Sequence, residues 1–266
     1  MAEVTWVLES EVFPDSHTTM TEAVLAGGHS VVRWSDEWWV TGRWPRLGET
    51  ATVFHGSLGN AARIRQELPW APGAFCATDR FRCSAWYPAA RPWLLHESWV
   101  LTSVAALVAD PEAALAPIGS PRAVFVRPDS PLKPFSGRVV TCAGLTLRAL
   151  DHGFYYDDTS LAVVAAPVRA VGREFRYVVC EGRVVAGSAY SAQRAPMPDD
   201  PGGMAWALAT EIAASLPAPD PVHVMDLCET PEGLRLLELN PFSGADLYAC
   251  DRRDVVAEVS RVALTT

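Results

Sequence analysis

The stretch "LRLLELNPFSG" near the end of the chain carries a carboxylate and an amide that could share one metal ion. Glu238 and Asn240 are two residues apart on a predicted strand, so their side chains leave the same face. Asp226 lies on the preceding predicted strand and joins that face if the hairpin pairs it with residue 236 or 238. Oxygen ligands of this kind suit Mg²⁺, which keeps several waters and takes further ligands from substrate phosphates. The alternative is the solvated polar face of an ordinary antiparallel sheet.

A second stretch, "FVRPDSPLKPFSG", contains two cationic side chains. Arg127 ends a predicted strand, and Lys133, the only lysine of the chain, follows in a loop rich in proline and serine. A cation at a strand end and another on a loop could clamp a triphosphate. The loop lacks the glycines and the Lys-Ser/Thr pair of a Walker A motif, so the clamp would be of another kind.

Glu174 and Arg176 in "GREFRYVV" also share one face of a predicted strand. In a binding site, the carboxylate could hold a sugar hydroxyl and the guanidinium a phosphate oxygen. The alternative is a surface ion pair that contributes little to stability.

The elements that must position these residues follow from the spacing of apolar side chains. Strand, helix and strand patterns alternate over residues 4–10, 17–28, 30–34 and 50–68, which predicts a small α/β unit with parallel pairing. Residues 99–110 are expected to be helical up to Pro111, and residues 69–98 show no assignable pattern. Hairpins are predicted over 173–191 and 221–242, with a helix between them at 202–216.

Composition limits the partners of the chain. The net charge of −9 and the pI near 5.2 argue against binding to nucleic acid or to an anionic membrane. No apolar run reaches the length of a membrane-spanning helix, and no signal peptide is recognisable, so we expect a cytoplasmic protein. The six scattered cysteines are expected to be buried thiols. The oligomeric state does not follow from the sequence.

The order of these pieces resembles that of the ATP-grasp superfamily of ATP-dependent carboxylate–amine ligases. The resemblance covers about residues 120–250, and "LLELNPFSGADLY" after "VMDL" is its most specific part. It implies an α/β (α+β) protein with an ATP-grasp fold. An N-terminal α/β domain would span residues 1–115 and an ATP-grasp domain residues 116–266, with a small lobe over about 120–168 and a C-terminal lobe over about 169–266.

The resemblance implies a set of nucleotide contacts. Arg127 takes the place of a strand-end lysine that contacts phosphates, and Lys133 would be the loop cation that closes over them. The backbones of Val168 and Ala170 would read the adenine, and Glu174 would bind the ribose hydroxyls.

It also implies the groups that perform the chemistry. Arg176 would stabilise the transferring phosphoryl group, together with Arg127 and Lys133 as the other catalytic cations. The predicted Mg²⁺ ligands are Asp226, Glu238 and Asn240. The predicted contacts to the acceptor substrate are Ser243, Gly244 and Asp246.

The implied activity is formation of an amide bond through an acyl phosphate, with ATP and Mg²⁺ as cofactors and small molecules or peptides as substrates. Two alternatives remain open at this point. One is a catalytically silent nucleotide-binding module that recruits a partner, and the other is kinase-like phosphoryl transfer without ligation.

Overall fold

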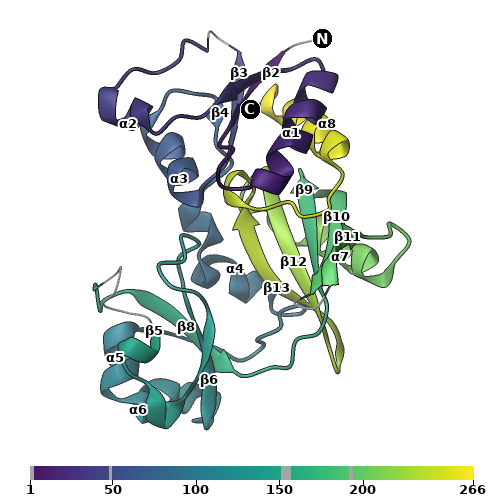
Figure 1. The fold of residues 1–266 in the computed structure, drawn as a ribbon. Helices are drawn as coiled ribbons and strands as arrows, with labels where there is room; N and C mark the ends of the chain where they lie inside the picture. The colour runs from purple at the N-terminus through teal and green to yellow at the C-terminus, as the bar shows by residue number, and fades with distance from the viewer. Residues whose placement is uncertain (1–2, 48–49, 151–156, 192–193) are drawn as a thin grey trace. The chain divides into compact units, whose positions relative to one another are not determined.

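The computed structural model describes residues 3–47, 50–150, 157–191 and 194–266 (Figure 1). The chain divides into two compact units, and it passes between them more than once. The first unit consists of Met1–Ala77, Arg173–Cys228 and Glu238–Thr266, and the second of Thr78–Gly172 and Glu229–Leu237. The domain boundary predicted between residues 115 and 116 stays a prediction.

The first unit begins with a parallel sheet of strand order β2-β1-β3-β4. Its strands are β1 (Val4–Leu8), β2 (Ser30–Arg33), β3 (Ala51–His55) and β4 (Pro72–Gly73). The helices along this part of the chain are α1 (Pro14–Ala26), α2 (Glu37–Thr41) and α3 (Leu58–Glu67). All five residues of β1 are buried, as expected for a strand with a parallel neighbour on each side. The predicted α/β unit with parallel pairing is therefore confirmed.

The same unit contains a five-stranded sheet of order β11-β10-β9-β12-β13. Its strands are β9 (Glu174–Cys180), β10 (Arg183–Ser191), β11 (Arg194–Pro198), β12 (Val222–Thr230) and β13 (Gly233–Pro241). Two helices accompany them, α7 (Met204–Ser215) and α8 (Arg252–Ala263). Both predicted hairpins are present, and the first turns at Glu181 and Gly182, which both have positive φ. A bulge at Val185 shifts the pairing of β10 with β9 by one residue.

One hydrophobic core joins these elements of the first unit. Trp6 is fully buried, and its indole Nε1 donates to Ser260 Oγ on α8 at 3.0 Å. Strands of both sheets and the last helix contribute the other members, which include Val4, Val53, Val178, Val224, Phe242, Val255 and Val259.

The second unit is built on an antiparallel sheet of order β5-β8-β6-β7. Its strands are β5 (Val100–Ser103), β6 (Ala123–Pro128), β7 (Arg138–Thr141) and β8 (Ala162–Pro167). Its helices are α4 (Cys83–Ala90), α5 (Val104–Ala109) and α6 (Pro111–Leu115). The continuous helix predicted up to Pro111 is wrong, because Val100–Ser103 pairs with β8 as a strand. Ser103 then caps α5 by accepting from the Ala106 N–H.

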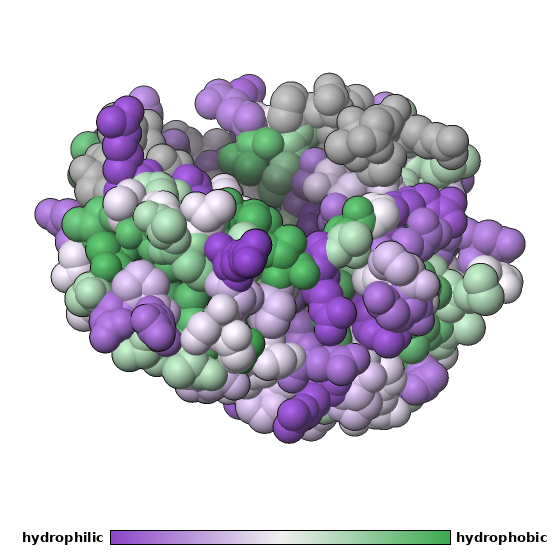
Figure 2. All heavy atoms as spheres, turned by 90° about the horizontal axis from the view of Figure 1, so that it is seen from below, coloured by the Kyte–Doolittle hydropathy of each residue, from purple (hydrophilic) through white to green (hydrophobic). Residues whose placement is uncertain are grey.

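The surface carries mixed polar and apolar side chains. Figure 2 shows hydrophilic and hydrophobic residues interspersed over one face. Within the described ranges, no helix combines the length and the apolar character needed to cross a membrane. Five of the six cysteines are buried, and Cys142 is half-buried.

We predict that Leu107→Ala lowers the free energy of unfolding by about 2–5 kcal/mol, because it opens a cavity in the core of the second unit. Leu107 is fully buried there, whereas Leu101 on β5 is 45% exposed. The matched variant Leu101→Ala should therefore cost much less in a urea titration. Equal losses for the two leucines would contradict this assignment of the core.

A second prediction concerns pH. His223 is buried on β12, its Nδ1 lies 3.2 Å from the Asp220 carbonyl oxygen, and burial lowers its pKa to about 4. Because the unfolded chain takes up a proton near pH 6.5 and the folded chain does so near 4, stability should fall as pH decreases through this window. His223 should account for about 3 kcal/mol of the loss. Urea titrations at pH 7 and pH 4 should show a smaller difference for His223→Gln than for the unchanged chain.

Candidate active site

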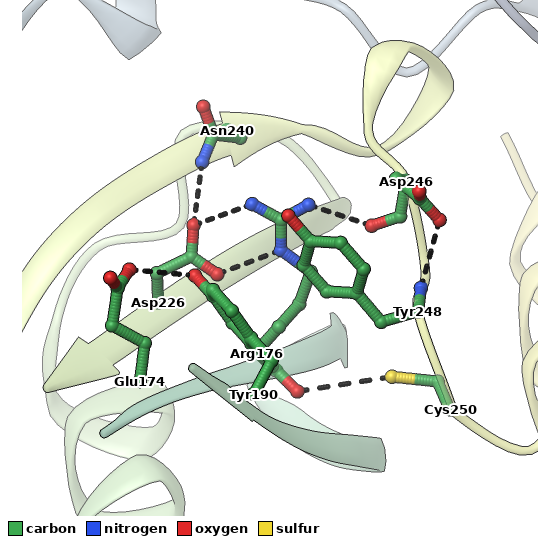
Figure 3. Close-up of polar contacts among 8 residues, drawn as sticks. All are labelled: Glu174, Arg176, Tyr190, Asp226, Asn240, Asp246, Tyr248 and Cys250. Atoms are coloured by element: carbon green, nitrogen blue, oxygen red, sulfur yellow. Dashed lines mark hydrogen bonds and ion pairs between the residues drawn. The ribbon is translucent and has the colours of Figure 1, made fainter. Parts of the chain in front are cut away.

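A buried ion pair between Arg176 and Asp226 lies at the centre of the polar cluster in Figure 3. The two residues are direct partners on β9 and β12, so both side chains leave the same face of the sheet. Arg176 Nε donates to Asp226 Oδ1 and Nη2 to Oδ2, both at 2.8 Å. Asp226 is 1% exposed and Arg176 8%. Burial alone would lower the pKa of Arg176, but the neighbouring carboxylate outweighs it, so this pKa is raised.

Asn240 on β13 extends the network to a third strand. Its Nδ2 donates to Asp226 Oδ2 at 3.0 Å, and its Oδ1 turns away from Asp226 (Figure 3). This bond places Asp226 and Asn240 on one face, as the sequence pattern predicts. Glu238 is two residues before Asn240 on the same strand, so it shares that face.

Glu174 adds a further carboxylate from the start of β9. Tyr190 on β10 is its direct partner across the hairpin, and the phenol donates to Glu174 Oε2 at 2.9 Å. Burial raises the pKa of Glu174, and the charges of Asp226 and Glu238 raise it further. Because the carboxylates affect one another's ionisation, the face carrying Glu174, Asp226 and Glu238 has a strongly negative potential.

The loop after β13 supplies the remaining contacts to Arg176. The Asp246 carbonyl oxygen accepts from Arg176 Nη1 at 2.7 Å, and the Tyr248 ring lies 4.7 Å from the guanidinium carbon. The Asp246 carboxylate accepts from the Tyr248 N–H at 2.9 Å. Sequence reasoning missed Tyr190 and Tyr248. A strict hairpin register would have opposed Glu174 with Ala189, and Tyr248 has no strand pattern that could reveal it.

Ser243 and Gly244, two of the predicted substrate contacts, make internal contacts of the first unit. Ser243 is fully buried, and its Oγ accepts from the Phe75 N–H at 2.9 Å. A Cβ at Gly244 would lie 2.8 Å from the Leu58 Cα, so glycine is required for close packing against α3. The substrate roles of Ser243, Gly244 and Asp246 stay a prediction.

Arg127, Lys133, Val168 and Ala170 belong to the second unit. Arg127 lies on β6 opposite Val164 and is buried. Lys133 has a φ of 48°, a conformation that costs energy for a residue with a Cβ and that often marks functional loops. Val168 and Ala170 directly follow β8 and are exposed. Their predicted meeting with the acidic residues of the first unit stays a prediction.

The donor set was tested for its ability to hold Mg²⁺. Across the described ranges, no group of three or more histidine, cysteine, aspartate and glutamate side chains could hold a metal ion. The predicted set differs, because it combines Asp226 and Glu238 with an amide oxygen. The carboxylates of Glu174, Asp226 and Glu238 face one guanidinium, and the raised pKa of Glu174 reflects that surplus of negative charge. A hard divalent cation fits both this surplus and these oxygen donors.

An α/β unit combined with antiparallel sheets that carry this acidic and cationic set defines an ATP-grasp protein. Residues 60–259, which are 200 of the 266 residues, match the model of a family described as an ATP-grasp domain, the third family of its clade. The chain therefore belongs to this family. The superfamily and fold predicted from the sequence are confirmed, and the predicted enzyme class, an ATP-dependent ligase, agrees with them.

Solved structures with low sequence identity share the fold. The crystal structure of D-cycloserine synthetase DcsG has a TM-score of 0.65 and 16% identity, covering 98% of this chain and 99% of the other. The Chryseobacterium gregarium RiPP-associated ATP-grasp ligase, in complex with ADP and a leader and core peptide, has a TM-score of 0.62 and 12% identity, covering 100% and 97%. ATP-grasp ligase PsnB, complexed with a phosphomimetic variant of a minimal precursor, Mg and ADP, has a TM-score of 0.59 and 14% identity, covering 97% and 98%. No curated protein matches the chain.

We predict that Asp226→Asn lowers the free energy of unfolding by about 3–5 kcal/mol, because it leaves the Arg176 charge buried without its partner. The matched change Glu238→Gln, on the same face, should cost less, since Glu238 is only half-buried. Adding Arg176→Gln to Asp226→Asn should recover part of the loss in a double-mutant cycle. Strictly additive losses would rule out the coupling.

Proposed function

We propose that this protein is an ATP-dependent carboxylate–amine ligase that forms an amide bond and releases ADP and phosphate. The observation that carries the proposal is the Arg176–Asp226–Asn240 network, surrounded by Glu174 and Glu238, on three neighbouring strands. A buried set of this kind costs stability unless a ligand uses it. Membership of the ATP-grasp family supports the proposal.

The proposed reaction has two steps. A substrate carboxylate oxygen attacks the γ-phosphorus of ATP, the bond to the bridging oxygen breaks, and ADP leaves. An amine nitrogen then attacks the acyl phosphate carbon, the carbon–oxygen bond breaks, phosphate leaves, and the amine loses a proton. Both steps build negative charge on oxygen, which fixed cationic donors stabilise.

Arg176 is the proposed catalytic cation of the first unit. Bidentate pairing with Asp226 and the bond to the Asp246 carbonyl oxygen fix its guanidinium before any ligand binds. A donor that is already oriented needs no reorganisation when charge develops, and this is the main source of its effect on rate. Asp226 therefore acts through Arg176 by setting the direction of its N–H groups.

The proposed ligands of Mg²⁺ are Asp226, Glu238 and Asn240. When bound, the ion would supply Lewis-acid stabilisation of phosphate oxygens. Asn240 already commits its Nδ2 to Asp226, so its Oδ1 is the atom suited to a cation.

The other nucleotide contacts are proposed from the family resemblance. Arg127 and Lys133 would hold the phosphates, the backbones of Val168 and Ala170 would read the adenine, and Glu174 would bind the ribose. The positive φ of Lys133 supports a loop that is shaped for a ligand.

The acceptor side of the reaction is proposed only as a class. The titles of similar structures name a precursor peptide, a leader and core peptide, and a cycloserine synthetase. A peptide or a small amino acid is therefore the first substrate class to examine. Asp246 and the backbone near Ser243 and Gly244 are the proposed acceptor contacts.

The decisive assay measures release of ADP and phosphate over a panel of amino acids and peptides in the presence of Mg²⁺. We predict turnover that needs both a carboxylate and an amine, and a fall in kcat of about 10²–10³-fold for Arg176→Lys. Arg183→Lys on β10 of the same sheet is the matched control, because Arg183 pairs with Glu258 at the surface. An equal effect of the two substitutions would refute the role of Arg176.

The two alternatives predict different products in the same assay. ADP formation with a stable phosphorylated acid, and no need for an amine, would replace the ligase proposal with a kinase-like one. Binding of ATP without any turnover over the whole panel would favour the silent module.

A further inference from the structure

The loop of residues 246–250 encloses Arg176 from more than one side. The Asp246 carbonyl oxygen binds one edge of the guanidinium at 2.7 Å, and the Tyr248 ring covers its face at 4.7 Å (Figure 3). The Tyr190 ring meets the Tyr248 ring, with centroids 4.5 Å apart and an interplanar angle of 39°. A guanidinium over the face of an aromatic ring is an attractive cation–π arrangement.

Tyr248 holds this position in a backbone conformation that tyrosine rarely adopts. Its φ is 47°, in the left-handed region, where a Cβ crowds the backbone. Such strain persists only where surrounding contacts impose it, and it gathers at functional sites.

Two residues impose that conformation. The Asp246 carboxylate accepts from the Tyr248 N–H at 2.9 Å. Arg252, at the start of α8, donates to the carbonyl oxygens of Tyr248 and Cys250, both at 2.6 Å. Because Arg252 is half-buried and its pKa is lowered by that burial, the chain places a costly cation here to hold the loop.

We propose that Tyr248 is a positioning residue that fixes the orientation of Arg176 by covering the face of its guanidinium, with Tyr190 packed against the Tyr248 ring. Among the described residues, the Arg176 contacts to Asp226 and Asp246 use three of its N–H groups. A guanidinium has five such groups, so two are left to meet a ligand. The stacked ring prevents the plane of the guanidinium from tilting, which keeps these two N–H groups in one direction.

A purely structural role for Tyr248 makes a different prediction. If the ring only fills space, leucine should replace it with a modest loss of stability and no change at Arg176. If the ring orients Arg176, phenylalanine should replace it and leucine should not, because leucine has no π face.

The first test observes Arg176 directly and needs no enzyme assay. The Nε–H resonance of Arg176 in a ¹⁵N–¹H spectrum is assigned by its absence in Arg176→Lys. We expect this proton to exchange slowly and to carry a ring-current shift in the unchanged chain and in Tyr248→Phe. Both properties should be lost in Tyr248→Leu.

The catalytic part of the inference rests on the proposed ligase function. Tyr248→Leu should lower kcat about tenfold with little change in the KM for ATP, whereas Tyr248→Phe should retain kcat. Tyr248→Gly relieves the backbone strain and removes the ring, so it should fold well and still lose kcat. Ser120→Gly, at another residue with positive φ, is the control for strain relief and should leave kcat unchanged.

Two results would overturn the inference. One is a Tyr248→Leu protein that is less stable but has the Arg176 resonance and kcat of the unchanged chain. The other is a Tyr248→Phe protein that loses the Arg176 resonance as Tyr248→Leu does. If the unchanged chain shows no ATP turnover, the proposed function fails, and the resonance experiment still decides the role of Tyr248.

Discussion

The pairing of Arg176 with Asp226 is the interaction on which the rest of the site depends. Two opposite charges at 2.8 Å, almost removed from water, are tolerable only as a pair, since either one alone would carry a large desolvation cost. The pair exists because β9 and β12 are neighbours in the sheet and oppose these two residues. Asn240, Glu174, Tyr190 and Tyr248 are then arranged around a centre whose geometry the backbone has already fixed.

The site also illustrates how a sheet concentrates charge. Neighbouring strands place side chains of one face close together, so carboxylates from β9, β12 and β13 share a small region with a single guanidinium. The resulting surplus of negative charge is unfavourable for the isolated chain, and the raised pKa of Glu174 is its direct expression. Stored unfavourable electrostatics of this kind is typical of sites that bind cations.

Local patterns carried much of the prediction, and long-range pairing limited it. The alternation of polar residues at 238 and 240 correctly indicated one face shared with Asp226, and the order of motifs indicated the ATP-grasp family. Three features lay beyond such reasoning. The partner of Asp226 depends on the pairing of β12 with β9, which are distant in sequence. The strand at residues 100–103 forms only because β8 is available beside it. Tyr248 reaches Arg176 through an irregular loop that has no repeating pattern.

The bulge at Val185 has a consequence for how this hairpin can change over evolution. Because side chains alternate between the two faces of a strand, the extra residue decides that Tyr190, and not Ala189, stands opposite Glu174. Deleting one residue between the turn and Tyr190 would exchange the two and send the phenol toward the interior. The identities of the intervening residues are thus open to drift, while the number of residues between the turn and Tyr190 is not.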